Sequence, residues 1–318
     1  MLTYSLFIAG FVFLIKGADI LVEGASDIAR RLKISELVVG LTIVAFGTSA
    51  PEMAVNIIAS VEGNSGIAFG NIVGSNIANT LLILGAASFI FPIKVQKSTV
   101  YREIPFSMLA ALVLFLMAND IMIDRQKENF LSRIDGFILL LFFSIFMYYI
   151  YTLAQKSKEK ENEEEPPGKI YKSIIYIVLG ILGLYYGGDW IVAGAVEIAR
   201  EFGLSEDIIG LTIVAIGTSL PELATSVTAS VKKSSDMAIG NVVGSNIFNI
   251  FWVLGLSASI RPLPISEGNN PDILVVLFSS FLLFLFLYFI KQHMMKRWHG
   301  SIFLFGYFLY IYNLVFSR

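Results

Sequence analysis

The sequence predicts an all-α integral membrane protein: ten transmembrane helices arranged as two inverted-topology five-helix repeats with broken core helices. Three observations predict this fold class. The composition is strongly apolar, hydrophobic runs recur along the whole chain, and two polar motifs interrupt these runs at matched positions in each half. Together they exclude a soluble globular fold.

The composition indicates a membrane protein. Of the 318 residues, 56% are hydrophobic and only 15% are charged, and the mean hydropathy is +0.73. Soluble domains carry about 25% charged residues. The absence of cysteine excludes disulfides and thiolate metal sites, and the net charge of −2 argues against a nucleic-acid partner. Residues 1–10 lack the pattern of a cleaved secretory signal, so we expect the first apolar run to be retained in the lipid bilayer.

Ten apolar segments each approach the ~20 residues that are needed to cross the hydrocarbon core. They cover residues 3–29, 36–61, 66–91, 102–119, 131–155, 172–199, 206–231, 236–260, 272–290 and 300–316. Between the fifth and sixth lies KSKEKENEEEPPGK, a charged and proline-broken solvated linker. We therefore divide one transport domain into a first repeat (1–155), a linker (156–171) and a second repeat (172–318).

The loop charges predict the orientation. Apart from Lys16, which lies within the first segment, 16 lysines and arginines fall on one side of the membrane and six on the other. The basic side should be cytoplasmic, which places the linker inside the cell and both termini outside. Five spans per repeat is an odd number, so the second repeat enters from the opposite side and the repeat is inverted. We expect a monomer in the cell membrane.

The first polar motif is GLTIVAFGTSAPE at residues 40–52, which recurs 170 residues later as GLTIVAIGTSLPE, with 11 of 13 positions identical. Pro51 has no N–H, so it cannot continue the helical hydrogen bonding. We expect carbonyls near Ala45–Thr48 to be left free, and Thr48, Ser49 and Glu52 to converge on one side. In lipid such a break is tolerated only against protein or a polar cavity.

Glu52 and Glu222 are the decisive residues of this motif. A charge at the bilayer centre costs about 2.5–3.5 kcal/mol on insertion scales, and neither motif holds an Arg or Lys that neutralises it. Matched polar interruptions in two related halves are typical of a transporter's binding site. A bound cation therefore explains the pair better than two protonated carboxyls that only bond neighbouring helices.

The second motif, GNIVGSNIAN at residues 70–79, recurs as GNVVGSNIFN at residues 240–249. Asn71, Ser75 and Asn79 are spaced by four and face one way. A parallel edge of small residues, Gly66, Gly70, Gly74 and Ala78, permits close helix approach. Packing alone explains the glycines, but it does not explain why the polar positions recur at Asn241, Ser245 and Asn249.

The pooled ligands are two carboxylates, amides, hydroxyls and carbonyls, which suit a hard cation rather than Zn²⁺ or Cu²⁺. Mg²⁺ prefers a strict octahedron and holds its waters, whereas Ca²⁺ accepts many oxygens in flexible geometry. The site therefore favours Ca²⁺ or Na⁺.

A second acidic set, Asp19, Glu23 and Asp27, shares one face of the first helix as a polar stripe, and Lys16 is spaced to pair with Asp19.

At these motifs the chain resembles the sodium/calcium exchangers of the cation/calcium antiporter superfamily, and most of all their compact prokaryotic members. The resemblance covers essentially all ten spans. It implies electrogenic exchange of several Na⁺ for Ca²⁺ by alternating access, in which the first and sixth helices slide against a core of broken helices. It implies neither an enzyme activity nor a cofactor, and the linker is too short for the calcium-sensing domains of animal relatives.

The resemblance also implies site residues. Glu52 and Glu222 would be shared by Ca²⁺ and Na⁺, and Thr48, Thr218, Ala45 and Ala215 would contribute backbone carbonyls. Ser49, Ser75, Ser219 and Ser245 would line flanking Na⁺ sites, with Asn79 and Asn249 at the centre. Some archaeal and potassium-dependent relatives carry Asp where this chain has Asn249, which argues against potassium dependence here.

Three alternatives use the same residues differently. A carboxyl buried in the membrane can carry a proton, so an H⁺/Ca²⁺ antiporter with the same fold and site is the main alternative. Its proton-coupled relatives usually carry a Gly-Asn-x-x-Glu second motif, which this chain lacks. A channel would normally need a ring of filter groups around an axis, and a metal-dependent membrane enzyme would need ligands and a nucleophile that are missing here.

Overall fold

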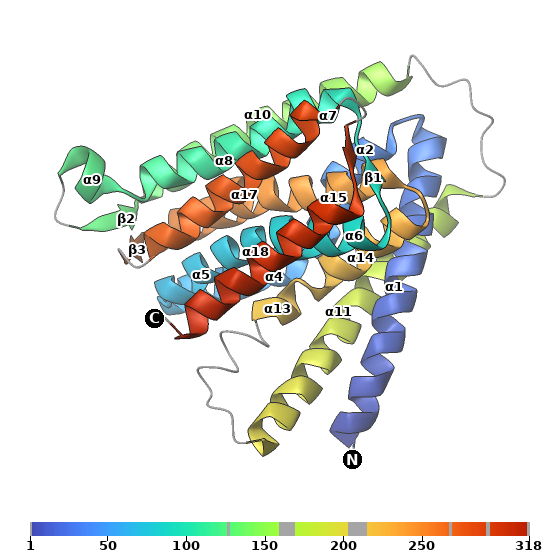
Figure 1. Cartoon of the computed structure of the whole chain (residues 1–318), viewed down its shortest axis with the longest axis horizontal. Helices are drawn as coiled ribbons and strands as arrows, with labels where there is room; N and C mark the ends of the chain where they lie inside the picture. The colour runs from blue at the N-terminus through green and yellow to red at the C-terminus, as the bar shows by residue number, and fades with distance from the viewer. Residues whose placement is uncertain are drawn as a thin grey trace.

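The computed structural model describes residues 2–125, 128–158, 169–202, 215–266, 269–290 and 293–316 (Figure 1). In the first half its elements are α1 (Leu2–Leu32), α2 (Glu36–Val39), η1 (Gly40–Val44), α3 (Ala45–Thr48), α4 (Ala50–Glu62), α5 (Ser65–Ile77), η2 (Ala78–Ile83), α6 (Leu84–Ile90), β1 (Ile93–Lys94), α7 (Lys97–Tyr101), α8 (Glu103–Met117), α9 (Asp120–Asp124), β2 (Asn129–Leu131) and α10 (Arg133–Lys158). In the second half they are α11 (Ile170–Glu201), α13 (Ala215–Thr218), α14 (Leu220–Val231), α15 (Ser235–Ile247), η4 (Phe248–Leu254), α16 (Gly255–Ile260), β3 (Leu263–Ile265), α17 (Asn270–Phe289), β4 (Met294–Met295) and α18 (Arg297–Phe316).

Within this described part, eight helices are long and apolar enough to cross a membrane. A ninth candidate is the segment from Glu36 to Glu62, whose two pieces are bent by 49°. The chain is thus a predominantly helical protein with several membrane spans, as the sequence predicts. The predicted span 206–231 begins among residues outside the described ranges, so the count of ten remains a prediction.

The two longest helices, α1 and α11, pack side by side and extend away from the other helices (Figure 1). Glycines bring their backbones together. A Cβ added to Gly17 would lie 2.7 Å from the backbone N of Leu184, and one added to Gly187 would lie 2.6 Å from that of Leu14. Such contacts leave no room for a side chain, which is how small residues drive helix association in a membrane.

The broken helices form where the motifs predict them. Pro51 lies in the first turn of α4, directly after a turn at Ser49, and Pro221 occupies the matched place in α14 after a turn at Ser219. π-Helical segments also match: η2 and η4 both begin at the end of the second motif. Local π-helix often marks functional sites, because it reorients the side chains that follow.

The small-residue edge of the second motif is a close packing surface in the second half. A Cβ added to Gly244 would lie 2.8 Å from the Cβ of Ala45, and one added to Gly240 would lie 3.0 Å from the carbonyl of Leu37. For Gly66, Gly70 and Gly74, no described residue lies within 4 Å of such a Cβ. Residues 210–214, the repeat counterpart of η1, lie outside the described ranges.

Two short antiparallel ribbons join loops that are far apart in the sequence. Strand β1 pairs with β4, and β2 pairs with β3. In the predicted topology, β1 and β4 both belong to loops on the basic side, whereas β2 and β3 both belong to loops on the other side. Each pairing is therefore consistent with the predicted alternation of the spans.

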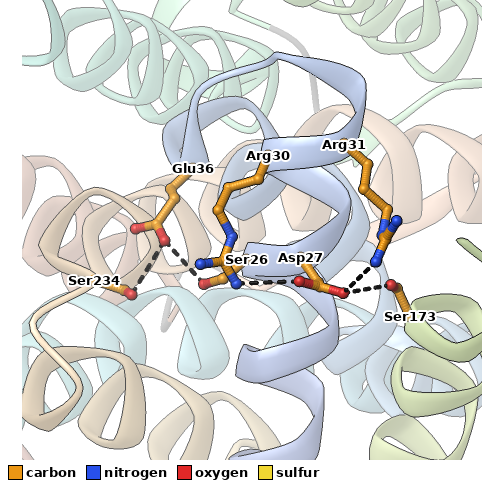
Figure 2. A network of polar contacts seen from close by, with 7 residues as sticks. All are labelled: Ser26, Asp27, Arg30, Arg31, Glu36, Ser173 and Ser234. Carbon is orange, nitrogen blue, oxygen red and sulfur yellow. Dashed lines mark hydrogen bonds and ion pairs between the residues drawn. The ribbon is translucent and has the colours of Figure 1, made fainter. Parts of the chain in front are cut away.

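The polar stripe of α1 is engaged in contacts with other elements, but one predicted pair is wrong. Asp19 pairs with Lys232 at the end of α14, at 2.5 Å, and not with Lys16. Asp27 accepts hydrogen bonds from Arg30, Arg31 and Ser173, the last from α11 (Figure 2). Spacing along one helix could not reveal a partner that lies 213 residues away.

Replacing Gly187 with Ala should destabilise the protein, because overpacking a tight contact costs about 1–3 kcal/mol. Its neighbour Gly188 is the matched control, since a Cβ there would have its nearest neighbour at 3.8 Å. Thermal unfolding of the purified variants should give a lower midpoint for Gly187→Ala than for Gly188→Ala. Equal midpoints would contradict the close packing of α1 on α11.

Candidate cation-binding site

Two buried glutamates lie at the helix breaks. Glu52 is in the first turn of α4 and Glu222 is in the first turn of α14, and each is only 1% exposed. The amino end of a helix favours a carboxylate, because its free N–H groups carry partial positive charge. Neither glutamate forms an ion pair with a lysine or arginine of the described residues. The site therefore concentrates negative charge without a cationic side chain.

Each glutamate is bonded to a serine of the other half. The Ser49 hydroxyl donates to Glu222 Oε1 at 2.9 Å, and the Ser219 hydroxyl lies 3.5 Å from Glu52 Oε1. The Ser245 hydroxyl lies 2.9 Å from that of Ser49, and because the single Ser49 proton goes to Glu222, Ser49 accepts this hydrogen bond. The two serine–glutamate contacts are related to each other by the repeat offset of 170, so the two half-sites meet as one.

The asparagines of the second motif make a matched pair of bonds between the halves. Asn79 Nδ2 donates to Asn246 Oδ1 at 3.1 Å, and Asn249 Nδ2 donates to Asn76 Oδ1 at 3.0 Å. In both cases the amide nitrogen is used, which leaves the amide oxygen of Asn79 and of Asn249 available. Asn76 and Asn246 were not among the predicted site residues, although they occupy matched positions of the repeated motif.

Five buried oxygens of the predicted site have no hydrogen-bond partner among the described residues: Glu52 Oε2, Glu222 Oε2, Asn79 Oδ1, Asn249 Oδ1 and Ser75 Oγ. A buried polar group without a partner costs roughly 1–3 kcal/mol by protein mutational data, and an isolated charge costs far more. Two carboxylate and two amide oxygens are the donors that Ca²⁺ and Na⁺ prefer. The site is chemically suited to a hard cation.

The remaining predicted residues lie on the neighbouring helical segments α3, α5 and α13. Thr48 is fully buried, and its hydroxyl donates to Asn241 Oδ1 at 3.1 Å. Ser75 is buried beside the Glu52 carboxyl. Thr218 is partly exposed, at the end of α13. Ala215 begins α13, and its side chain lies outside the described part.

The expectation of a free carbonyl is wrong at Ala45. Its oxygen accepts a hydrogen bond from the backbone N of Ser49 at 3.0 Å; the Thr48 hydroxyl lies 3.4 Å away, but its single proton is donated to Asn241. The reason is the turn at Ser49, which folds the chain back before Pro51 interrupts the helix. Proline removes the partner of Gly47, the residue four positions before it, and not that of Ala45.

Asn241 is a further residue that the site depends on. Besides meeting Thr48, it donates through Nδ2 to the Ser226 hydroxyl at 2.9 Å, and the matched Asn71 donates to Asn56 Oδ1 at 3.2 Å. The repeat of Asn71 at Asn241 predicted a role for these amides. Their partners on the neighbouring helix could be found only from the structure.

Fold and site together define a membrane protein with many spans and a buried, oxygen-lined candidate cation site between two related halves. The chain belongs to the sodium/calcium exchanger family, whose model, described as sodium/calcium exchanger protein, matches residues 2–152 and 172–316. The unmatched stretch between these ranges contains the predicted linker.

Relatives extend over most of the chain. The sodium/calcium exchanger MaX1 of Methanosarcina acetivorans is 32% identical over 94% of this chain and 94% of its own length. The inner membrane protein YrbG of Escherichia coli is 36% identical over 82% of this chain and 81% of its own length. Among solved structures, the sodium-calcium exchanger NCX_Mj soaked with Na⁺ and Sr²⁺ superposes with a TM-score of 0.84 at 33% identity, covering 100% of this chain and 99% of that one.

Ca²⁺ should stabilise the purified protein, because a ligand at 100 times its Kd adds about 2.7 kcal/mol to the folded state. The Ca²⁺-dependent rise in unfolding temperature should disappear in Glu52→Gln and in Glu222→Gln. Glu103→Gln is the matched control, since Glu103 is equally buried but bonds Tyr149 of α10. A Ca²⁺ response that survives in both site variants would contradict the site.

Proposed function

We propose that this protein is a secondary active antiporter that exchanges Na⁺ for Ca²⁺ across the cell membrane. The observation that carries the proposal is the pair of buried glutamates with unpaired oxygens, held by serines of opposite halves. Membership of the sodium/calcium exchanger family supports the choice of ions. Both ions are substrates, and the proposal needs no cofactor and no catalytic residue.

The proposed ligand set keeps the residues that the motifs predicted. Glu52 and Glu222 bind both kinds of ion. The side chains of Asn79 and Asn249 supply amide oxygens at the centre. Ser49, Ser75, Ser219 and Ser245 line the flanking Na⁺ sites. Backbone carbonyls come from Thr48, Thr218, Ala45 and Ala215. A carbonyl oxygen has two lone pairs, so the bond to Ser49 does not remove Ala45 from this set.

Coupling follows from charge. Two carboxylates in a low-dielectric site repel each other unless positive charge lies between them. One Ca²⁺ or several Na⁺ compensate the pair, but the ligands are too few for both at once. Mutually exclusive occupancy then couples the two ions, provided the site is exposed to one side of the membrane at a time.

The proposed topology has ten spans in two inverted repeats, with both termini outside and the 156–171 linker in the cytoplasm. Two observations support it. The cross-half bonds of Asn79 and Asn249 are related by the repeat offset, as a pseudo-two-fold axis requires. The ribbons β1–β4 and β2–β3 each join loops assigned to the same side.

Proteoliposomes loaded with Na⁺ should take up Ca²⁺, whereas vesicles loaded with K⁺ should not. Glu52→Gln and Glu222→Gln should each abolish this uptake, because one carboxylate cannot balance Ca²⁺. The Glu103→Gln control should retain it. Uptake driven by a pH gradient without Na⁺ would overturn the proposal in favour of H⁺ coupling, and uptake independent of any gradient would indicate a channel.

A further inference from the structure

Two aspartates at the repeat offset have different surroundings. Asp19 of α1 pairs with Lys232, whose ammonium lies 2.5 Å from the carboxylate and donates to the Asp19 carbonyl at 2.9 Å. Asp189 of α11 is exposed and forms no ion pair within the described ranges. At the position that matches Lys232, the first half carries Glu62, so the equivalent pair cannot form there.

The side chain of Asp189 borders a cavity of about 300 Å³ between α11 and the two broken helices. The cavity wall includes Pro51 and Pro221, the residues that precede the two site glutamates. The cavity therefore extends to the first turns of α4 and α14, which carry the two glutamates. An exposed carboxylate beside such a cavity attracts cations toward the site.

The repeat-related region beside Asp19 is more closed. Val22, Thr48 and Thr225 are 0–1% exposed, although Ala224 and Asp19 itself are partly exposed. The counterparts of the three buried residues around the cavity are Val192, Thr218 and Val55, all of which are partly exposed. In the region beside Asp19, α1 packs along α14. Residues that match in the two repeats therefore border an open cavity beside Asp189 and a more closed region beside Asp19.

A second contact ties α1 to the turn that follows α14. Glu36 accepts hydrogen bonds from Ser26 of α1 at 2.9 Å and from Ser234 of the turn at 3.3 Å (Figure 2). The bond from Ser173 to Asp27 ties α1 to α11 in the same region. These bonds lie at the end that carries Arg30 and Arg31, which we propose to be cytoplasmic.

We propose that Lys232 is a latch: by pairing with Asp19 it holds α1 against α14 and closes the cytoplasmic access route to the glutamate site. Within the described ranges the route beside Asp189 has no such pair, and it is open in this structure. The inference rests on the proposed alternating access. Asp19 and Lys232 are both partly exposed, and an exposed ion pair is weak enough to break in each transport cycle.

Thiol labelling tests the latch, because the chain contains no cysteine. Ala54 borders the open cavity, and Ala224 is its counterpart in the more closed region beside Asp19. In detergent, a polar maleimide should label Ala54→Cys rapidly and Ala224→Cys slowly. Adding Lys232→Gln should speed labelling at Ala224→Cys by roughly fivefold, a typical coupling to a two-state equilibrium, without speeding it at Ala54→Cys.

Two variants control for charge and for loosening of the fold. Lys233→Gln removes the neighbouring charge and should leave both labelling rates unchanged, and Lys232→Arg should keep Ala224→Cys slow. No effect of Lys232→Gln at Ala224→Cys, or equal acceleration at both positions, would overturn the latch. Labelling requires no ion exchange, so its failure is distinguishable from a failure of Na⁺/Ca²⁺ transport.

Discussion

The structure depends on two carboxylates that are buried close to each other without a cationic side chain. Glu52 and Glu222 lie at the amino ends of α4 and α14, and each receives a hydroxyl from the opposite half. In a low-dielectric setting this arrangement requires either a proton on a carboxyl or positive charge from outside the chain. In the proposed exchanger a bound cation supplies that charge, so ion binding also stabilises the packing of the helices that carry the glutamates.

The rest of the architecture holds these carboxylates in place. Proline breaks end the incoming helices at the site, π-helical segments turn the asparagines toward it, and glycines let α15 approach η1 and α3 closely. The proline breaks and the π-helical segments occur in both halves, so the site is nearly symmetric, whereas the close glycine contacts are described only for the second half. The ion pair between Asp19 and Lys232 breaks that symmetry. We infer that this pair closes the cytoplasmic access route, while the route beside Asp189 is open.

Much of this could be predicted from the sequence, because a repeat displays its functional positions twice. The helix breaks, the two glutamates and the serines were found in this way. Contacts between distant segments could not be predicted: Asn246 meets Asn79 and Lys232 meets Asp19 only after the halves fold together. The prediction of a free Ala45 carbonyl was wrong because Pro51 removes only the hydrogen-bond partner of the Gly47 carbonyl. The Ala45 carbonyl keeps a bond from the backbone N of Ser49.

The central claim is that Ca²⁺ and Na⁺ compete for the same two carboxylates. Equilibrium binding of radioactive Ca²⁺ to the purified protein, titrated with Na⁺ at constant ionic strength, tests it most directly. The account predicts that Na⁺ displaces Ca²⁺ completely and with a Hill coefficient above one, whereas K⁺ displaces none. Ca²⁺ that stays bound at saturating Na⁺ would contradict the shared site.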